Sequence, residues 1–222
     1  MKIIKLLLGF LFIALVMSCV TRVSLDHQSF INDKKVGVVV VVDSITVAKA
    51  GGQGILDIVL TPGNRFKEPL KKVEPRIKVI EKMEAEIEAI LKFYKKPYQL
   101  ISENLNFENL EPFDEKQPGK VYANKDYRKF KSTHQIDELM IISVSFGMIV
   151  SYYGMIEIGK DGFAYVWIDT FDLEDNSIIQ KEKYSTYSRI KGNWKEGDDY
   201  EKLVDAIQDA VDKAVKALDT KI

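Results

Sequence analysis

A nearly unbroken run of valines, Val36 to Val42, limits the folds open to this chain more than any other feature of the sequence. Only Gly37 interrupts the run, and β-branched residues favour strands over helices. A strand that is apolar on both faces has to be covered on both sides. The run therefore predicts a central strand of a sheet at the start of a folded domain.

Two amphipathic patterns predict helices that cover this sheet. Apolar residues recur every three or four positions over 70–94, which predicts one long helix with Pro75 in its first turn. The same spacing over 203–218 predicts a closing helix. Asp198 and Glu201, just before it, have the spacing of a capping box, which indicates where this helix begins.

Several other segments, rich in β-branched and aromatic residues, predict further strands, and turn sequences at 160–162 and 174–176 predict hairpins between the last three. A weaker helix is predicted over 124–135. This order of elements indicates an α/β (α+β) domain with a mixed sheet of about four to six strands. In this domain the long helix follows the first strand, and the C-terminal helix packs on the sheet. The predicted strands are 98–102, 138–152, 155–158, 163–171 and 178–187.

The segment 44–68 interrupts the regular pattern and predicts an irregular loop, with a short strand at 55–60. It contains Gly51, Gly52 and Gly54, whose backbone amides could together face an anion, which makes them a candidate binding site. No Gly-Lys-Ser or Gly-Lys-Thr sequence follows, and the spacing fits no phosphate-binding fingerprint. A flexible loop without a ligand is the alternative interpretation.

The amino terminus has the layout of a secretory signal peptide. Lys2 and Lys5 precede an apolar run, Leu6 to Met17, and the small residue Ser18 stands before Cys19. A helix over this run rises only about 18 Å, whereas the hydrocarbon core of a bilayer measures roughly 30 Å. The run is therefore predicted to be a cleaved leader rather than a permanent membrane span.

The end of this leader, Val16 to Cys19, resembles the lipobox of bacterial lipoproteins. The resemblance implies cleavage between Ser18 and Cys19 and acylation of the Cys19 thiol. Two or three acyl chains anchor a protein in a membrane without a spanning helix. The alternative is an ordinary signal peptide that happens to be followed by cysteine.

The lipobox divides the chain into a signal peptide (1–18), a lipidated tether (19–35) and a single α/β domain (36–222). The tether is predicted because its residues are polar and show no clear period. Val20 stands where enteric lipoproteins kept in the inner membrane carry aspartate, so the resemblance favours the outer membrane. The predicted location is the periplasmic face of that membrane.

A second resemblance covers the folded part of the chain, from Val36 to Leu218. The order of elements and the turn at 172–179 resemble the small periplasmic α/β domain shared by the TolB amino-terminal domain, CsgG and the penicillin-binding-protein activator LpoB. Asp175 and Asn176 replace the Thr-Gly of that pattern, and they still suit a turn that needs positive φ. The resemblance implies a non-catalytic scaffold, secretion component or activator that contacts an envelope protein.

Composition and motifs exclude or disfavour several other functions. The chain has 32 basic and 33 acidic residues, so it shows no basic excess of the kind that nucleic-acid binding needs. Cys19 is the only cysteine, which excludes an internal disulfide and a thiolate metal cluster. His27 and His134 are the only histidines. No metal site, cofactor or catalytic residue is therefore predicted.

Aromatic residues at alternate positions of the segment 163–171, namely Phe163, Tyr165, Trp167 and Phe171, predict that their rings share one face of a strand. That face is either part of the core or an exposed recognition stripe.

Two functions remain after these exclusions. The first is a membrane-anchored, non-catalytic interaction or scaffold module that binds an envelope protein through the loop 44–68 or an exposed sheet edge. The alternative is a small-ligand-binding protein or enzyme with a site near that loop, which a deep polar pocket would favour.

Overall fold

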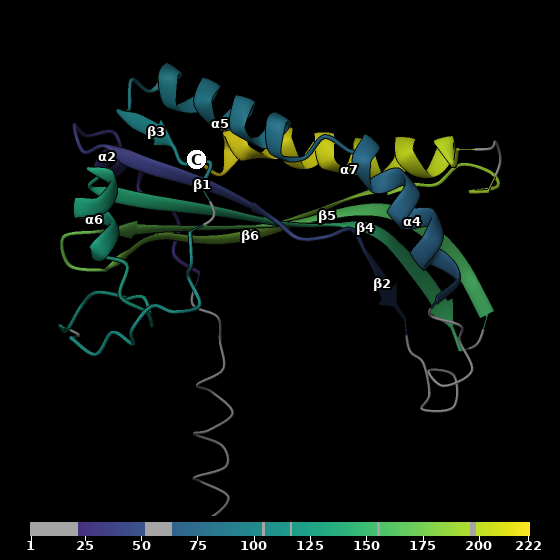
Figure 1. The fold of residues 1–222 in the computed structure, drawn as a ribbon, viewed down its shortest axis with the longest axis horizontal. Helices are drawn as coiled ribbons and strands as arrows, with labels where there is room; N and C mark the ends of the chain where they lie inside the picture. The colour runs from purple at the N-terminus through teal and green to yellow at the C-terminus, as the bar shows by residue number, and fades with distance from the viewer. Residues whose placement is uncertain (1–21, 52–63, 104, 116, 155, 196–198) are drawn as a thin grey trace, which may run out of the picture.

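The computed structural model describes residues 22–222 except 52–63, 104, 116, 155 and 196–198 (Figure 1). Its elements in chain order are α2 (His27–Phe30), β1 (Val36–Val42), β2 (Thr46–Ala50), η1 (Asn64–Phe66), α4 (Lys67–Val73), η2 (Glu74–Arg76), α5 (Ile80–Phe93), β3 (Tyr98–Leu100), α6 (Lys129–His134), β4 (Glu138–Tyr153), β5 (Ile156–Asp172), β6 (Ile178–Arg189), α7 (Glu201–Ala217) and η3 (Leu218–Thr220).

The strands form one six-stranded mixed sheet in the order β3-β1-β4-β5-β6, with β2 paired to β4 beyond the end of β1. β1 runs parallel to β3 and β4, whereas β4, β5 and β6 form an antiparallel meander. This confirms the predicted fold class and the interior position of the valine strand.

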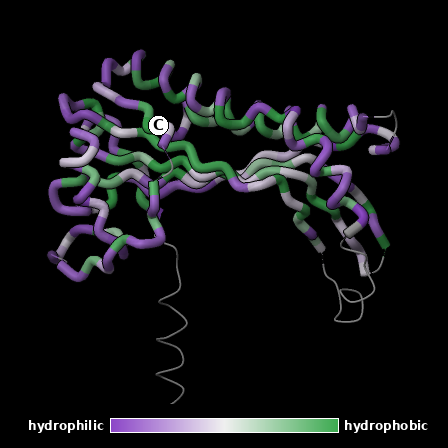
Figure 2. Tube along the Cα trace, viewed as in Figure 1, coloured by the Kyte–Doolittle hydropathy of each residue, from purple (hydrophilic) through white to green (hydrophobic). Residues whose placement is uncertain are grey.

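The two long helices, α5 and α7, lie on the same face of the sheet, whereas α6 and the chain before it cover the other face only at one end (Figure 1). Figure 2 shows hydrophobic stretches of the sheet beneath these helices, interrupted by hydrophilic positions. The valine strand is accordingly buried from Val36 to Val39, while Val41 is exposed. The prediction of a strand covered on both sides holds only for its first half.

The closing helix α7 is confirmed, and its buried residues include Leu203, Ile207 and Val211. Its start differs from the predicted capping box. The N-cap is Tyr200, which has φ 55° and makes no side-chain capping hydrogen bond, so Glu201 becomes the first helical residue. Asp198 lies outside the described residues.

The predicted long helix over 70–94 is two helices. α4 ends at Val73, η2 carries Pro75, and α5 begins at Ile80. Glu74, the residue before Pro75, is still helical, with φ −48° and ψ −48°, and the chain becomes extended at Ile77, with φ −92° and ψ 119°. Proline has no N–H to donate, so Pro75 cannot continue the hydrogen-bonded pattern of α4 and lies in η2, between the two helices, instead of in the first turn of one long helix.

The predicted turn at 160–162 is wrong, because β5 runs without a break from Ile156 to Asp172. The chain reverses earlier, at Gly154, which has φ +59°. Gly162 has a different role, since a β-carbon there would lie 2.3 Å from the carbonyl oxygen of Ala206 in α7. The glycine lets α7 approach the sheet closely.

The second predicted turn, at 174–176, is confirmed between β5 and β6, with Asn176 at φ 65°. Lys120 Nζ lies 2.5 Å from the Asp175 carboxylate, and the Ser177 N–H donates to the same side chain. Burial alone would raise the pKa of Asp175, but these contacts lower it to about 2. The turn therefore keeps its negative charge at all but strongly acidic pH.

Two other segments differ from expectation. The helix predicted over 124–135 is shorter, since α6 spans only Lys129–His134. The segment 44–68 contains the strand β2, which continues the parallel pairing along β4 and was not predicted. The strand predicted at 55–60 lies outside the described residues.

Residues 22–35, which we call the strap, pack on the body, unlike the free tether predicted over 19–35. Val23 exchanges two backbone hydrogen bonds with Lys181 of β6, with N–O distances of 3.1 and 2.8 Å. Further along the strap, α2 buries Phe30 in the main core. The chain is thus held against the body from its first described residues.

Candidate functional site

The face of the sheet away from α5 and α7, which we call the open face, is the candidate site. On the helix side, the hydroxyls of Tyr184 and Thr186 in β6 donate to carbonyl oxygens of α7 at 2.9 and 2.6 Å. Neighbouring side chains of a strand alternate between faces, so odd-numbered positions point to the open face in β5 from Gly159 to Phe171 and in β6 from Lys181 to Arg189. Register shifts at the ends of these stretches reverse the alternation beyond them. The central open face consists of Ser143, Ser145, Tyr165, Trp167, Lys183, Ser185 and Tyr187.

A second, smaller core covers one end of the open face. Val39, Leu139 and Ile141 of the sheet pack there with residues from 101–136, including α6. Phe171 also lies in this core, stacked on Tyr127 with ring centroids 4.3 Å apart. The central open face begins where this cover ends.

The alternating aromatic residues lie partly in the core and partly on the surface, so each of the two predicted alternatives holds for some of them. Phe163 and Phe171 are buried, while Trp167, between them, is 39% exposed. The Tyr165 ring lies 4.7 Å from Phe163, 6.3 Å from Trp167 and 6.1 Å from Tyr187, measured between ring centroids. A ladder of aromatic rings therefore runs from the core onto the surface.

Two tyrosines of this ladder are joined by their hydroxyls. The Tyr187 hydroxyl lies 3.3 Å from that of Tyr165, at hydrogen-bonding distance. Burial and this neighbour raise the pKa of Tyr165 to about 12. The Tyr165 phenol therefore stays neutral at physiological pH and offers a hydrogen-bonding group rather than charge.

A hollow of about 490 Å³ lies beside Trp167 on the open face. Arg22 pairs with Glu182 at 2.6 Å, and Lys181 lies 3.8 Å from Asp169. Burial raises the pKa of Asp169, although Lys181 opposes the shift. The residues around the hollow are Arg22, Trp167, Asp169, Lys181, Glu182 and Lys183. This arrangement suits recognition of a mixed polar and aromatic surface, because most of the charges are already paired.

Beside this face, a buried polar cluster fixes the strap to the sheet. Lys96 and Glu138 have side chains only 0% and 2% exposed, and Lys96 Nζ lies 2.8 Å from Glu138 Oε2. Lys96 also donates to the Asn32 side-chain oxygen at 2.7 Å, and Asn32 donates to Glu138 Oε1 at 3.3 Å. The ammonium sits 4.5 Å above the Phe30 ring. Burial lowers the pKa of Lys96, although contact with Glu138 opposes the shift.

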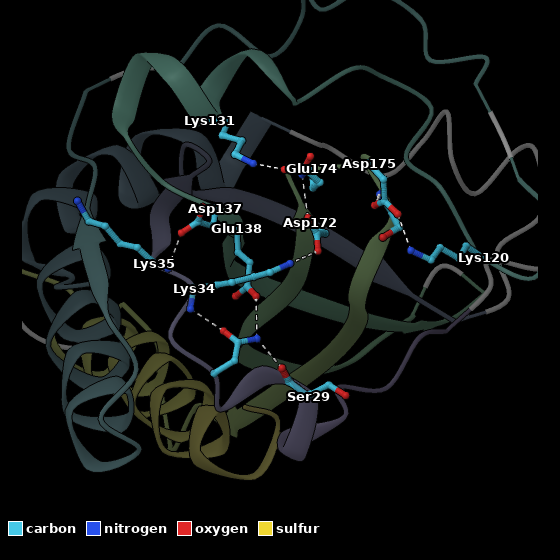
Figure 3. Close-up of polar contacts among 12 residues, drawn as sticks. Ser29, Lys34, Lys35, Lys120, Lys131, Asp137, Glu138, Asp172, Glu174 and Asp175 are labelled. Carbon is cyan, nitrogen blue, oxygen red and sulfur yellow. Dashed lines mark hydrogen bonds and ion pairs between the residues drawn. The ribbon is translucent and has the colours of Figure 1, made fainter.

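Figure 3 shows that more contacts join the end of the strap to the ends of the strands. Lys34 Nζ pairs with Asp172 at 2.6 Å, and the Lys35 N–H donates to the Asp137 carboxylate at 3.0 Å. Glu138, at the start of β4, lies between Asp137 and the Lys34–Asp172 pair. The strap, the start of β4 and the end of β5 therefore form one connected polar network.

The predicted glycine site stays a prediction, because Gly51 is the only one of its three glycines within the described residues. Gly51 has φ +109°, and a β-carbon there would lie 2.0 Å from the Tyr152 carbonyl oxygen, so the backbones of β2 and β4 meet too closely for any other residue. Its role is structural. Gly52, Gly54, Ser18 and Cys19 lie outside the described residues.

Near the start of the 44–68 segment, a hollow of about 400 Å³ has Asp43, Ser44, Glu74 and Lys78 among its lining residues. Glu74 accepts a hydrogen bond from the Ile45 N–H at 2.9 Å and so fixes the chain leaving β1. Glu74, one of the two acidic residues named in this hollow, therefore has a structural role.

The described residues contain no cluster of three or more histidine, cysteine, aspartate or glutamate side chains that could hold a metal ion. None of the helices within the described ranges has the length and apolar character to cross a membrane. His27 contacts the Tyr94 ring and His134 lies 3.2 Å from Glu103, so the structure does not bring the two histidines together.

The Lys96–Glu138 pair and the hollow beside Trp167 were not predicted from the sequence. A pair of charged residues this far apart in sequence leaves no periodic signal. The only local indication is position, since Glu138 opens an otherwise apolar strand and Lys96 stands between a helix and Pro97.

No protein-family model and no curated protein matches the sequence. Solved structures similar to this chain include a protein from Xanthomonas campestris, with 11% identity, coverage of 90% of this chain and 89% of that chain, and a TM-score of 0.38. A lipoprotein from Neisseria meningitidis has 12% identity, coverage of 80% and 99%, and a TM-score of 0.32. A minor lipoprotein from Acinetobacter baumannii has 7% identity, coverage of 84% and 93%, and a TM-score of 0.33. Similarity at this level carries no conclusion about function.

Proposed function

We propose that this chain is a lipid-anchored, non-catalytic interaction module of the bacterial cell envelope. In this proposal the open face binds an envelope protein, and the lipid on Cys19 holds the module at the periplasmic face of the outer membrane. The observation that carries the proposal is a sheet face that the described residues leave uncovered, with Trp167 and Tyr187 exposed, beside the point where the strap joins β6.

The strap makes the anchor short. Val23 is already paired with β6, and four residues of extended chain span at most about 14 Å, so the body would stand close to the membrane. A module held at this distance meets membrane-bound partners at high local concentration. The aromatic rings and prearranged ion pairs of the open face suit protein recognition, where tyrosine and tryptophan are enriched.

Replacing Cys19 by alanine tests the anchor. The wild-type protein is expected in the membrane fraction, with a mass increased by acyl chains. The Cys19→Ala protein is expected in the soluble fraction, because it has no thiol to carry the acyl chains that hold the mature chain at the membrane. Cell fractionation and intact-mass spectrometry measure both outcomes. Equal membrane content of the two proteins, or an unmodified mature Cys19, would contradict the anchor.

Photocrosslinking in intact cells tests the interaction surface. A photoreactive residue at Tyr187, on the open face, is expected to give one discrete adduct with an envelope protein. The matched control is the same residue at Lys92, which is exposed on α5 on the opposite side of the sheet. The same adducts from both positions, or recovery of the uncrosslinked protein alone, would count against a partner at the open face.

A further inference from the structure

The hairpin between β4 and β5 ends in an exposed apolar tip. Tyr153, Ile156 and Ile158 are 78%, 67% and 59% exposed. These three side chains and Gly154 form what we call the hairpin tip. Exposed apolar residues scattered singly are ordinary, but a group at the end of one projecting element marks a contact surface.

The hairpin tip carries no unpaired charge among its described residues. Glu157, the one charged residue between the two isoleucines, forms ion pairs with both Arg65 and Lys160. The backbone is paired across the hairpin, where Tyr152 is opposite Glu157 and Tyr153 is opposite Ile156. Entry of the tip into an apolar phase would therefore leave few polar groups without partners.

The anchor point, where the strap joins β6 at Val23, lies beside the hollow of the open face. Arg22, three residues after Cys19, lies at the outer edge of β6, where it pairs with Glu182 and borders the hollow that Trp167 and Lys183 also line. Figure 1 shows the joined ends of β4 and β5 curving away from α5 and α7, toward the side of the open face. Asp169, beside the anchor point, and Ile156 are separated by roughly 40 Å along β5.

We infer that the hairpin tip inserts into the surface of the phospholipid bilayer that holds the Cys19 lipid, an inference that rests on the proposed function. Tyrosine favours the headgroup region of a bilayer, and isoleucine favours the hydrocarbon beneath it. A lipid anchor by itself leaves the body free to rotate about the strap. A second contact at the far end of the sheet fixes the orientation of the body and turns the open face into a sheltered space above the bilayer.

A fluorescent label at the tip tests this inference. Cys19 is the only cysteine and is acylated in the lipidated protein, so a cysteine introduced by Tyr153→Cys is the sole site for a nitrobenzoxadiazole maleimide. The lipidated full-length protein is added to preformed vesicles of phosphatidylethanolamine and phosphatidylglycerol that contain a nitroxide-labelled lipid. Because the Tyr153 side chain is largely exposed, its replacement leaves the core intact.

The matched control is Phe93→Cys, since Phe93 is 79% exposed but lies at the end of α5 on the helix side of the sheet. The label at Tyr153 is expected to shift to shorter wavelength on adding vesicles and to be quenched several-fold more than the label at Phe93. Adding Ile156→Ser to the Tyr153→Cys protein is expected to reduce this quenching.

Three results would overturn the inference. Equal quenching at both positions, on protein that floats with the vesicles, would refute the tip contact while leaving the anchor intact. A spectral shift at Tyr153 that needs no vesicles and grows with protein concentration would assign the tip to a second copy of this chain. Failure of either labelled protein to float would refute the lipid anchor itself.

Discussion

Glu138→Ala is expected to lower the free energy of unfolding by about 3–5 kcal/mol, because it leaves the Lys96 ammonium buried without its counter-ion. Lys96 and Glu138 are almost wholly inaccessible to water, and Asn32 of the strap bonds to both. Urea denaturation followed by circular dichroism measures the loss. Limited proteolysis should cut within the strap of the variant first, because its hold on the sheet depends on the same pair.

The free energy of unfolding of the Glu138→Ala protein is expected to depend on pH through Lys96. Burial already lowers the pKa of Lys96, and removing Glu138 takes away the contact that opposes the shift. The folded state then binds fewer protons at Lys96 than the unfolded state, so stability rises as pH increases toward the ordinary lysine pKa. The Glu138→Ala protein should therefore recover part of its stability between neutral and alkaline pH.

Two controls separate this explanation from simple loss of packing. The double variant Lys96→Met, Glu138→Leu has no buried charge and is expected to be within about 1 kcal/mol of the wild type, or more stable. Glu81→Ala, which breaks the exposed pair with Lys78, is expected to cost about 1 kcal/mol or less. A double variant as unstable as Glu138→Ala would refute the explanation by an unpaired charge.

Gly162→Ala is expected to destabilise the fold by about 1–3 kcal/mol or more, because the new methyl group overlaps the backbone of α7. The β-carbon would lie 2.3 Å from the Ala206 oxygen and 2.6 Å from the Ile207 nitrogen, and neither atom can move without shifting the helix. Thermal unfolding should show the loss, at roughly 2–4 °C per kcal/mol for a chain of this size.

The comparison for this variant is Gly159→Ala, three residues earlier in the same strand. A β-carbon there meets the guanidinium end of Arg189, which can rotate away into solvent. Its expected cost is a few tenths of a kcal/mol, typical of a surface position. Equal losses at the two glycines would show that the approach of α7 does not set the requirement at Gly162.

The sequence predicted those parts of the fold that depend on local periodicity. The valine strand, the long strand from Glu138 and the closing helix each carry a pattern over enough residues to be recognised without their neighbours. The mixed sheet follows from their order. The same reasoning failed at Gly162, because a glycine that permits helix packing has the same local sequence as one that permits a turn.

The candidate site was predictable only in part. The alternating rings from Phe163 to Trp167 indicated a shared face, but their exposure depends on which parts of that face α6 and its preceding chain leave uncovered. The strap was mistaken for a free tether because its polar sequence has no period, although Val23 and Phe30 attach it through contacts with residues far along the chain.

The strap also determines how the folded body would respond to tension. A pull on the amino terminus would first load the two hydrogen bonds between Val23 and Lys181, at the edge of the sheet. The Phe30 side chain would have to leave its core before the load reached β1. Mechanical extraction of the protein from a bilayer would therefore peel the strap away in stages, and the central strands would be the last to feel the force.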